Sequence, residues 1–391
     1  MVSYAYYVST KWEGEANMTS AAQAAATAPA PTRGKPLTID DLDTPAMVVD
    51  MDKLQANINE LQAYCNAHGL NNRPHIKTHK VTYIAKMQLD AGATGIACQK
   101  LGEVEVMVEA GITGDIMLCY NVMGAQKLER LRAVSQLTDI TLTVDSEYTA
   151  RGISAYADPN HPINLVVELA MPNFERTGVP TQEDALALAK VIDKLPGVHF
   201  RGLMMYPTTK PEQQETAAAA REYFEQNGLP PEIVSGGGSV DFHDLHRIPH
   251  ATEVRVGTFN YGDRNTVANG VMTYEQCAQR FICTVVSKPT PERVILDGGT
   301  KTFTSDMPQV GDPRSVFCHI IEYPEARVFA QSEEHGHVDV SLCERTPEIG
   351  ERVSVIPNHA CGATNNFDEV VMHRNGEVVA IWPIWARGKI R

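Results

Sequence analysis

The stretch HFRGLMMYPTTKPEQQETAAAAREYFEQNGLPPEIVSGGG, residues 199–238, decides the fold. It begins with a short, largely apolar run at 199–206, which is typical of a buried strand. A polar, alanine-rich segment at 211–226 follows and predicts a helix. A second apolar run at 232–238 ends in three glycines. A strand, a helix and another strand in this order predict a βαβ unit with parallel strands.

The same unit repeats on both sides of this stretch. Between Arg73 and about Gly257, apolar runs alternate with helix-like segments such as 100–110, 124–135 and 181–194. The strand candidates are RPHIK, TGIACQ, DIMLCY, ITLTVD, INLVVELA, HFRGLMMY, EIVSGGG and TEVRVGT. Continuous apolar strands between helices imply a parallel sheet that is covered on both faces. Eight such units predict a closed (β/α)8 barrel, which takes about 250 residues. An open doubly wound sheet is the alternative.

The rest of the chain divides into three parts. Residues 1–37 are rich in Ala, Thr and Pro and predict a disordered extension without a secretory-signal pattern. A strand at 46–50 and a helix at 51–68 precede the barrel, and we expect that strand to join the second domain. Strands and turns dominate 275–391, where the Asn-Gly of RNGEV predicts a hairpin. We therefore predict a barrel domain at 38–274 and an all-β domain at 275–391.

The composition excludes two classes of function. The formal net charge is -14, and no Lys/Arg cluster offers the basic face of a nucleic-acid-binding protein. No apolar run approaches the roughly 20 residues that span a bilayer. The scattered cysteines form no CxxC pair, and several lie in apolar runs, so we interpret them as buried free thiols in a reducing compartment. We expect a cytoplasmic protein, with organelle targeting by the extension left open.

Unusual residues stand where the predicted barrel strands end. These are Lys77 after the first strand, Arg176 after the fifth, Tyr206 after the sixth, Gly236–Gly238 after the seventh, and Gly257 with Thr258 after the eighth. Barrel enzymes place their sites on this face, and the loops after strands seven and eight often bind phosphate. Consecutive glycines let backbone N–H groups converge on an anion.

An amine and an anion pocket together indicate a cofactor. Lys77 at the end of a buried strand is costly to keep as a desolvated ammonium, so it can serve as a Schiff-base amine. A solvated loop lysine is the alternative. An aldehyde cofactor that carries a phosphate suits both features. Arg176 and Tyr206 are candidates to face its ring; a surface salt bridge and a rim aromatic are the alternatives.

A second candidate site lies near the C-terminus. PNHAC places His359 and Cys361 two residues apart. On a strand, such residues face the same way. One imidazole and one thiolate on one face suit a divalent metal with positions open to water or substrate. A buried histidine beside a free cysteine is the alternative.

These motifs resemble the fold-type III pyridoxal-phosphate enzymes, whose barrel is that of the alanine racemase N-terminal domain. They are most similar to the group of D-threonine aldolases and D-serine dehydratases. The resemblance runs from about Leu42 to Arg387. It is carried by DTPAMVVDMDKLQANI, RPHIKTHK, GIACQKLGEVE, SGGGS, LDGGTKTFTSD, SEEHGHVDV and WPIWARG.

The resemblance implies roles for the site residues. Lys77 would form a Schiff base with pyridoxal 5'-phosphate, with Arg176 and Tyr206 near the pyridine ring. Phosphate contacts would come from Ser235, Gly236, Gly237, Gly238, Ser239, Gly257, Thr258 and Tyr261. His359 and Cys361 would bind Mn²⁺, Mg²⁺ or Zn²⁺, with His359 as a candidate base. The resemblance also implies a head-to-tail homodimer in which the β domain of one chain covers the barrel mouth of the other.

The activity implied is retro-aldol cleavage of D-threonine and other D-3-hydroxy amino acids to glycine and an aldehyde. Dehydration of D-serine or 3-hydroxyaspartate to a 2-oxo acid and ammonia is the alternative, because dehydratases carry His-x-Cys whereas some aldolases carry His-x-Asp. MMYPTT also stands where well-studied aldolases often have Tyr-His-Gly, although the C-terminal WPIWARG is more aldolase-like. A non-catalytic cofactor carrier needs no metal site and a racemase needs two opposed bases, so we favour neither.

Overall fold

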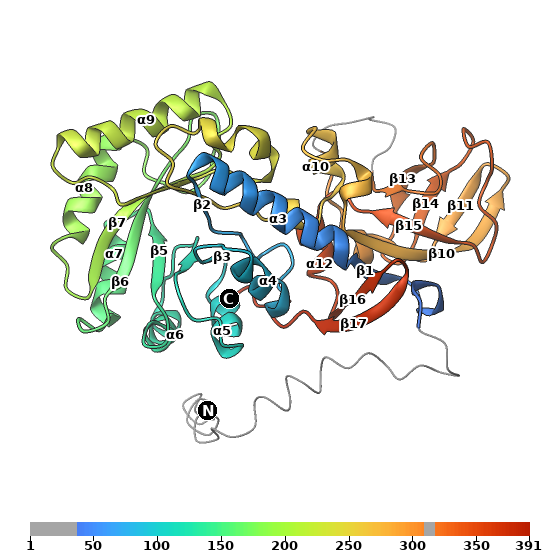
Figure 1. Ribbon diagram of the computed structural model, residues 1–391, viewed down its shortest axis with the longest axis horizontal. Helices are drawn as coiled ribbons and strands as arrows, with labels where there is room; N and C mark the ends of the chain where they lie inside the picture. The colour runs from blue at the N-terminus through green and yellow to red at the C-terminus, as the bar shows by residue number, and fades with distance from the viewer. Residues whose placement is uncertain (1–36, 309–316) are drawn as a thin grey trace, which may run out of the picture.

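The computed structural model describes residues 37–308 and 317–391. Figure 1 shows a barrel and a β domain side by side, with the β domain in orange and red. The extension predicted at 1–37 lies outside the described residues except for Leu37. No helix in the two described segments is both long and apolar enough to cross a membrane. The cysteines all lie in these segments and are free, and most of them are buried.

Eight parallel strands of the described chain form the predicted barrel, in the spatial order β2-β9-β8-β7-β6-β5-β4-β3. The ring closes beyond the end of β2, where His75 bridges Ala97 of β3. There the Ile76 N–H donates to the Ala97 carbonyl at 2.9 Å, and the Ala97 N–H donates to the Pro74 carbonyl at 2.9 Å. The predicted barrel is therefore confirmed over the open sheet. The strands are β2 (Asn71–Asn72), β3 (Ile96–Cys98), β4 (Ile116–Leu118), β5 (Ile140–Val144), β6 (Ile163–Leu169), β7 (Val198–Met205), β8 (Ile233–Gly236) and β9 (Glu253–Val254).

Helices cover the outside of these strands. They are α4 (Thr82–Asp90), α5 (Leu101–Glu109), α6 (Ala125–Ser135), α7 (Glu147–Tyr156), α8 (Gln182–Ile192) and α9 (Pro211–Gln226). Strand β5 is buried along its whole length, which explains why these runs are continuously apolar rather than alternating. After β8 and β9 the chain instead forms 3-10 helices, η3 (Ser239–Arg247) and η4 (Thr258–Asn260).

The second domain is built on a mainly antiparallel sheet, as predicted. Strand β1 (Ala46–Asp50) lies in this sheet, antiparallel to β10 and parallel to β16. Asn375 and Gly376 have φ angles of 48° and 85° and form the expected Asn-Gly hairpin between β16 and β17. The strands after the barrel are β10 (Gln279–Thr290), β11 (Arg293–Leu296), β12 (His319–Ile320), β13 (Arg327–Gln331), β14 (Gly336–Asp339), β15 (Arg352–Ile356), β16 (Glu369–Arg374) and β17 (Glu377–Pro383).

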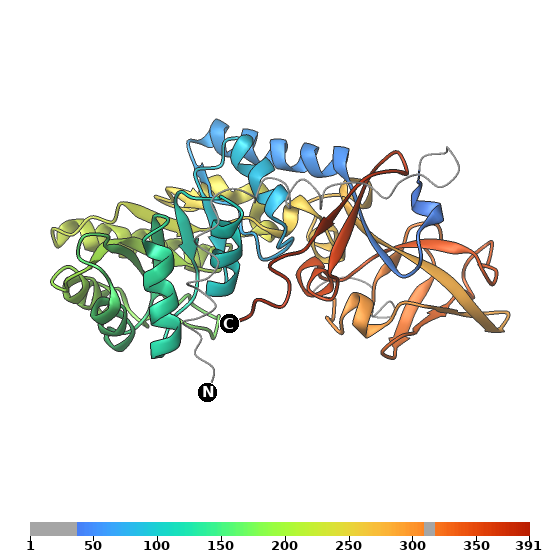
Figure 2. The ribbon, with the colours of Figure 1, turned by 90° about the horizontal axis from the view of Figure 1, so that it is seen from below.

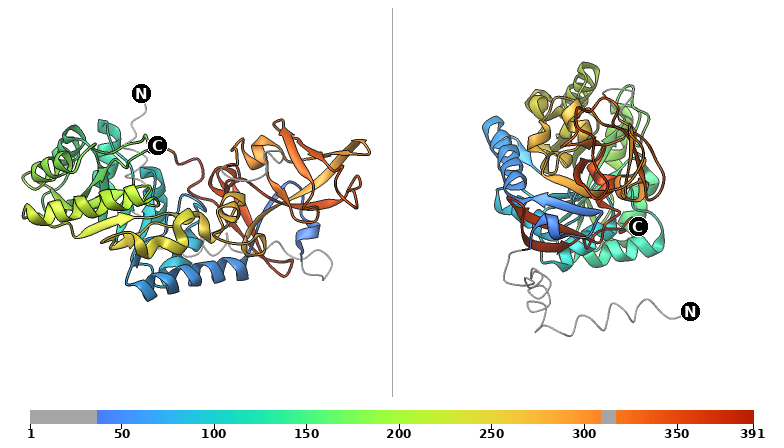
Figure 3. Two further views of the ribbon diagram at one scale, coloured as in Figure 1. Left: turned by 90° about the horizontal axis from the view of Figure 1, so that it is seen from above. Right: turned by 90° about the vertical axis from the view of Figure 1, so that its right-hand side faces the viewer.

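Two segments tie the domains together. Helix α3 (Met51–His68) follows β1 and runs along both domains (Figure 3). Its Leu54 packs in the core of the β domain, whereas its Leu61 packs with Phe242 at the barrel. The segment after β17 returns to the barrel (Figure 2), where the Gly102 N–H donates to the Arg391 carbonyl at 3.0 Å. Both ties hold the β domain beside the carboxyl ends of the barrel strands.

Candidate active site

A cavity of about 250 Å³ lies at the carboxyl ends of the barrel strands. Its walls come from the turn after β2, the ends of β7 and β9, the loop after β8 and helix α12 (Ala360–Thr364) of the β domain. The structure thus brings the predicted amine, glycine loops and metal ligands to one pocket. The predicted residues that line it are Lys77, Arg176, Tyr206, Gly237, Gly238, Ser239, Gly257, Thr258, His359 and Cys361.

Three residues expected at the phosphate are not among the residues that line this pocket. Ser235 is fully buried in the barrel interior, where its Oγ donates to Glu253 Oε1 at 2.6 Å. Gly236 pairs with Val254 of the neighbouring strand below the cavity. Tyr261 packs in the core of the β domain, with its ring centroid 6.3 Å from that of His79. The single turn η4 separates Tyr261 from the pocket residue Thr258, and the predicted role of Tyr261 at the phosphate stays a prediction.

Lys77 lies in a tight turn rather than in the strand itself. Strand β2 stops at Asn72, and the bridge at His75 is the last ladder contact before this turn. Lys80, at the end of the turn, has a φ angle of 56°, and its Nζ lies 2.6 Å from Glu103 Oε1 in a buried ion pair. That ion pair fixes the turn to helix α5. Of the two lysines in RPHIKTHK, only Lys77 therefore lines the pocket.

His75 supports the Lys77 turn as a neutral ring. Its Nδ1 accepts the Lys77 backbone N–H at 3.5 Å, and its Nε2 lies 3.2 Å from Gln99 Oε1, which assigns the ring proton to Nε2. Burial, followed by the charges of Lys77 and Arg255, lowers the pKa of His75 well below its ordinary value. The ring therefore adds no charge beside the Lys77 amine.

The glycine turns leave no room for side chains at the pocket wall. Gly237 has a φ angle of 72°, and a Cβ there would lie 2.5 Å from Leu245 Cδ2. A Cβ at Gly257 would lie 2.9 Å from the His75 carbonyl oxygen. The backbone itself therefore forms this wall. Helices η3 and η4 begin directly after these turns, and the first turn of a helix leaves N–H groups without helical partners. Such groups suit a phosphate.

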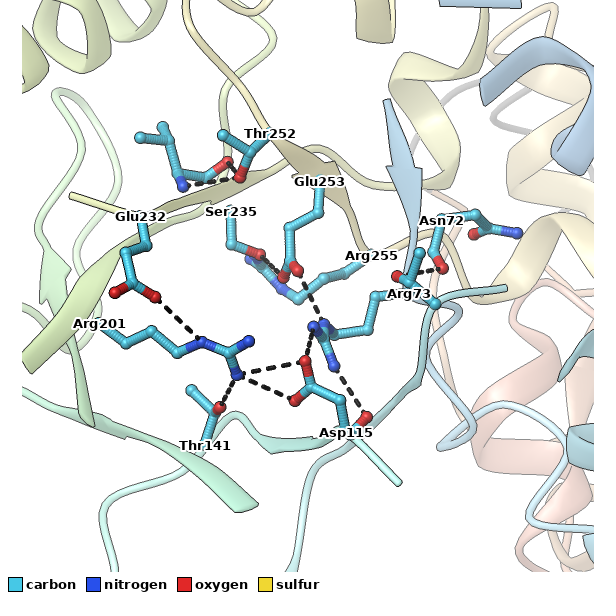
Figure 4. A network of polar contacts seen from close by, with 12 residues as sticks. Asn72, Arg73, Asp115, Thr141, Arg201, Glu232, Ser235, Thr252, Glu253 and Arg255 are labelled. Atoms are coloured by element: carbon cyan, nitrogen blue, oxygen red, sulfur yellow. Dashed lines mark hydrogen bonds and ion pairs between the residues drawn. The ribbon is translucent and has the colours of Figure 1, made fainter. Parts of the chain in front are cut away.

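A buried cation, Arg255, lines the pocket from β9. Its Nη1 donates to Ser235 Oγ at 2.5 Å and its Nη2 donates to the Met205 carbonyl at 3.1 Å. Ser235 in turn donates to Glu253, which accepts from Arg73 Nε at 2.8 Å. Figure 4 shows this chain of contacts inside the barrel. We missed Arg255 in the sequence, although Glu253 and Arg255 alternate with valines in TEVRVGT and so share one face of the strand.

The network continues to the far end of the barrel. Arg73 Nη2 lies 2.7 Å from Asp115 Oδ2, and Arg201 Nη1 lies 3.2 Å from the same oxygen. Arg201 also donates to Thr141 Oγ1 at 2.9 Å. Because Arg73 contacts both Asp115 and Glu253, it links the carboxylates of two strands that lie apart in sequence (Figure 4).

His359 and Cys361 lie at the start of a helix, not on a strand. Strand β15 ends at Ile356 and His359 is the N-cap of α12, so the argument that a strand places both side chains on one face is wrong. The helical turn nevertheless brings the two side chains into hydrogen-bonding contact. Asp263 Oδ2 lies 3.1 Å from His359 Nδ1 and accepts the Ala360 N–H at 3.0 Å. Thr78 Oγ1 lies 3.1 Å from Cys361 Sγ.

The imidazole and the thiol stabilise each other's charged form. The charge of Cys361 raises the pKa of His359 to about 11, against burial and with help from Asp263. Burial raises the pKa of the Cys361 thiol, but the charge and hydrogen bond of His359, with Lys77 and Thr78, lower it to about 7. A metal replaces protons on ligands of this kind. Within the described segments, no group of three His, Cys, Asp or Glu side chains could hold a metal ion. A metal on this pair would therefore keep positions open.

Sequence reasoning missed several further pocket residues. Asp263 had a signal, because DRNT is an N-cap pattern: the Thr266 N–H donates to Asp263 Oδ1 at 2.8 Å at the start of α10 (Arg264–Ala268). The remaining ones were not singled out in the sequence, since only the folded chain brings them to the cavity. They are Thr78, Gln99, Cys119, Met204, Val240, Asn265 and Thr266.

Comparisons with known proteins agree with this fold. Residues 49–265 match the family model of the alanine racemase N-terminal domain, and residues 278–373 match that of a putative serine dehydratase domain. D-threonine aldolase from Arthrobacter sp is 33% identical over 366 residues, which cover 89% of this chain and 93% of that protein. The crystal structure of D-threonine aldolase from Filomicrobium marinum matches with a TM-score of 0.80 at 27% identity, covering 93% of this chain and 100% of that one.

A third relative is a dehydratase. The structure of D-threo-3-hydroxyaspartate dehydratase from Delftia sp. HT23 matches with a TM-score of 0.78 at 26% identity, covering 88% of this chain and 98% of that one. The barrel and its companion sheet are thus those of the alanine-racemase-like proteins. Within them, the chain belongs to the group of D-threonine aldolases and D-serine dehydratases, which confirms the resemblance found in the sequence.

The interior network generates a prediction about stability. Arg73→Met would leave the buried carboxylate of Glu253 without its cation, with only the Ser235 hydroxyl still donating to it. Removing one partner of a buried ion pair costs about 3 kcal/mol. Thermal and urea unfolding would measure the loss. Arg201→Met is the matched control: Arg201 contacts the same Asp115 but is a quarter exposed, so its loss is expected to cost less than about 1 kcal/mol. Equal losses in the two variants would contradict this assignment.

Proposed function

We propose that the protein is a pyridoxal-phosphate-dependent lyase that cleaves D-threonine and other D-3-hydroxy amino acids to glycine and an aldehyde with the help of a divalent metal. The observation that carries this proposal is the pocket shared by the Lys77 amine, the glycine turns and the His359–Cys361 pair. Relatives that span nearly the whole chain are D-threonine and 3-hydroxy-D-aspartate aldolases, which supports the substrate class.

The pocket fits pyridoxal phosphate. Lys77 would hold the cofactor through its aldehyde, and the backbone N–H groups after Gly237 and Gly257 would hold the phosphate. Arg176 and Tyr206 would flank the ring; the guanidinium carbon lies 5.5 Å from the tyrosine ring centroid. The bound cofactor supplies an electron sink for the pair left behind when a bond to the substrate α-carbon breaks.

The His359–Cys361 pair fits a divalent metal. An imidazole and a thiolate favour Zn²⁺, whereas Mn²⁺ and Mg²⁺ prefer oxygen ligands. Such an ion lowers the pKa of a hydroxyl that it binds. One solved form of the dehydratase relative, a cysteine-to-alanine variant, is described as metal-free.

The chain's own residues would orient the substrate and move its protons. Asp263 occupies His359 Nδ1, so Nε2 is the ring nitrogen left to bind the metal or to take the β-hydroxyl proton. Thr78 and Thr258, whose hydroxyls lie 3.1 Å and 3.8 Å from the sulfur, keep Cys361 facing the barrel. Once the Cα–Cβ bond has broken, the Lys77 amine is the group placed to return a proton to Cα and give glycine.

A dehydratase is the second candidate. The observation that favours it is the thiol at position 361, together with the match to the Delftia dehydratase. In that reaction Lys77 would remove the α-proton and hydroxide would leave the β-carbon. The two reactions use the same residues and are separated by their products.

The central prediction concerns those products. With pyridoxal phosphate and Zn²⁺ or Mn²⁺, the protein is expected to convert D-threonine, but not L-threonine, to glycine and acetaldehyde, and a chelator should abolish the reaction. Lys77→Ala should lose both the turnover and the visible absorbance of the amine-bound cofactor, because no other lysine among the described residues lines the pocket. Coupled aldehyde reduction and absorbance spectroscopy measure the two effects. Lys194→Ala, at an exposed lysine in the turn after α8, is the matched control and should behave like the parent protein.

Two results would decide against this proposal. Release of ammonia and a 2-oxo acid from D-serine, with no aldehyde from D-threonine, would establish the dehydratase. A Lys77→Ala variant with unchanged cofactor absorbance would remove both candidates.

A second prediction concerns Asp263, which contacts the proposed metal ligand His359. Asp263→Asn keeps the size of the side chain but weakens its hold on His359 Nδ1, and such changes typically lower metal affinity about 10- to 100-fold. Titration of the metal-stripped protein with Zn²⁺ measures this. Cofactor absorbance and the melting temperature should change little, and unchanged Zn²⁺ affinity would show that Asp263 does not orient the ligand.

We also propose a head-to-tail homodimer in which the β domain of one chain covers the pocket mouth of the other. Apolar side chains on the barrel rim support it: Tyr120, Met123, Tyr148 and Phe174 are 41%, 50%, 79% and 40% exposed. They follow strands β4, β5 and β6 at the same end as the pocket. An apolar rim of this kind marks an interaction surface.

This arrangement predicts the outcome of a double substitution. Met123→Asp with Tyr148→Asp should produce a folded monomer in size-exclusion chromatography with light scattering. Leu137→Asp, at an exposed leucine between α6 and β5 on the opposite end of the barrel, is the control and should remain dimeric. A monomeric parent protein would contradict the dimer.

A further inference from the structure

A buried carboxyl group, that of Asp241, lies beside the glycine loop of the pocket. It stands in the first turn of η3, directly after the pocket residues Gly238, Ser239 and Val240. The residue is 7% exposed, and its Oδ2 is buried without a hydrogen-bond partner among the described residues. An ionised oxygen in that place would have neither water nor a donor, which is costly. The environment therefore favours the protonated carboxyl.

The neighbours of Asp241 leave its charge uncompensated. Burial, and to a smaller extent the charge of Asp244, raises the pKa of Asp241 to about 7 against a hydrogen bond from the Gly238 backbone. Tyr206 faces it from the end of β7, and burial and then the charge of Asp241 raise the pKa of Tyr206. Within η3, Arg247 is paired with Asp244 at 3.1 Å.

The other titratable groups around η3 lie on its α3 side or act elsewhere. Tyr64 packs against Phe242 with tilted rings, and its hydroxyl lies 2.6 Å from His246 Nδ1. His68 stacks on the His246 ring. The pocket arginines, Arg176 and Arg255, act on Tyr206 and are not among the groups that shift the pKa of Asp241. The carboxyl thus meets the glycine loop without a cation of its own.

A second anion at this loop would lie close to the carboxyl, because Asp241 follows the pocket residues Ser239 and Val240 in the first turn of η3. This step rests on the proposed function, in which the phosphate of the cofactor sits on the backbone of the loop that starts η3. A phosphate monoester carries a charge of about -1.5 to -2 at pH 7. Two like charges that share a site cannot both stay ionised cheaply, and the weaker acid takes the proton. Asp241 is the weaker acid of the two.

We propose that Asp241 takes up one proton when the phosphate group of the cofactor binds, and that it serves the bound state as a neutral carboxylic acid. The proton comes from solvent and goes to a carboxylate oxygen, and no other bond changes. A neutral carboxylic acid is also a hydrogen-bond donor, as a phosphate acceptor requires. Asp241 is a positioning residue of the phosphate loop in this account, and it makes cofactor loading sensitive to pH.

The direction of this sensitivity follows from proton linkage. Below about pH 7 the carboxyl is already protonated in the free protein, so binding takes up no proton. Above that pH the free protein has an ionised Asp241 and the bound protein a protonated one. Binding then consumes a proton, and affinity for the phosphorylated cofactor falls by up to about tenfold for each pH unit. Pyridoxal, which lacks the phosphate, does not bring the second charge.

The experiment compares dissociation constants of the parent protein and Asp241→Asn between pH 6 and pH 9, measured by absorbance titration with pyridoxal phosphate. The asparagine keeps the size and a donor but cannot ionise. Dividing the dissociation constant of the parent protein by that of the variant removes the effects of titrating Lys77 and the phosphate, because these effects are the same in both proteins. We expect a flat ratio up to about pH 7 and a rise of about tenfold per unit above it. With pyridoxal the ratio should stay flat throughout.

Asp244→Asn is the matched control, since Asp244 lies on the same helix but is more than half exposed. Its charge contributes a smaller part of the raised pKa of Asp241, so this variant should move the onset of the rise slightly to lower pH and keep its slope. A ratio that is flat for pyridoxal phosphate, or that rises equally for pyridoxal, would overturn the inference. If Asp241→Asn fails to fold, calorimetry of the parent protein at pH 8 in buffers of different ionisation enthalpy decides. Uptake of up to one proton more for pyridoxal phosphate than for pyridoxal supports the inference, and equal uptake rejects it.

These outcomes are separable from those of the proposed function. A parent protein that never develops the visible absorbance of an amine-bound cofactor, at any pH, contradicts the function itself. Normal absorbance with parallel pH profiles in the parent and Asp241→Asn contradicts only the role of Asp241.

Discussion

The hydrogen bonds that close the barrel between Pro74–Ile76 and Ala97 determine where the functional groups lie. Because β2 is short, closure depends on this bridge beyond its end, and the chain must turn sharply right after it. Lys77 stands in that turn. The Lys80–Glu103 pair and the His75–Gln99 contact hold the turn from two sides, and both partners come from the segment that follows β3. The element that completes the barrel thus also fixes the amine.

The barrel interior beneath the pocket contains buried charged and polar side chains instead of an apolar core. Buried ion pairs add little net stability compared with well-packed apolar side chains, so a network like that of Arg73, Glu253 and Ser235 is better explained by what it positions. It ends at Arg255, whose guanidinium is held by a hydroxyl and a carbonyl rather than by a direct carboxylate contact. Arg255 therefore reaches the pocket as a cation that is fixed in place but only indirectly neutralised.

The sequence was sufficient for the barrel because its information is local. Each of the eight apolar runs and each helix between them can be recognised from its own residues. Gly237, Gly257 and Lys77 stand at the ends of such runs, and in a parallel barrel the loops after the strands all lie on one face. One interpretation failed where local geometry changed, because β15 stops before His359. At η4, a single turn places Tyr261 in the core shared with the β domain, which no pattern in the sequence indicated. Arg255, Asp263 and Thr78 act through partners 20 to 283 residues away, and no pattern along the chain records such pairs.

The division of the site between the two domains bears on its chemistry. The barrel supplies the amine and the glycine loops, whereas the imidazole and the thiol come from the β domain and contact Asp263, Thr78 and Thr258 of the barrel. The proposed cofactor site and the proposed metal site would thus belong to different domains, which α3 and the C-terminal segment hold together. The two proposed reactions, aldol cleavage and dehydration, would both use the amine, the cofactor and a metal held by the imidazole and the thiol. What separates them is which bond to the α-carbon is aligned to break, and that depends on how the β-domain ligands orient the substrate over the barrel.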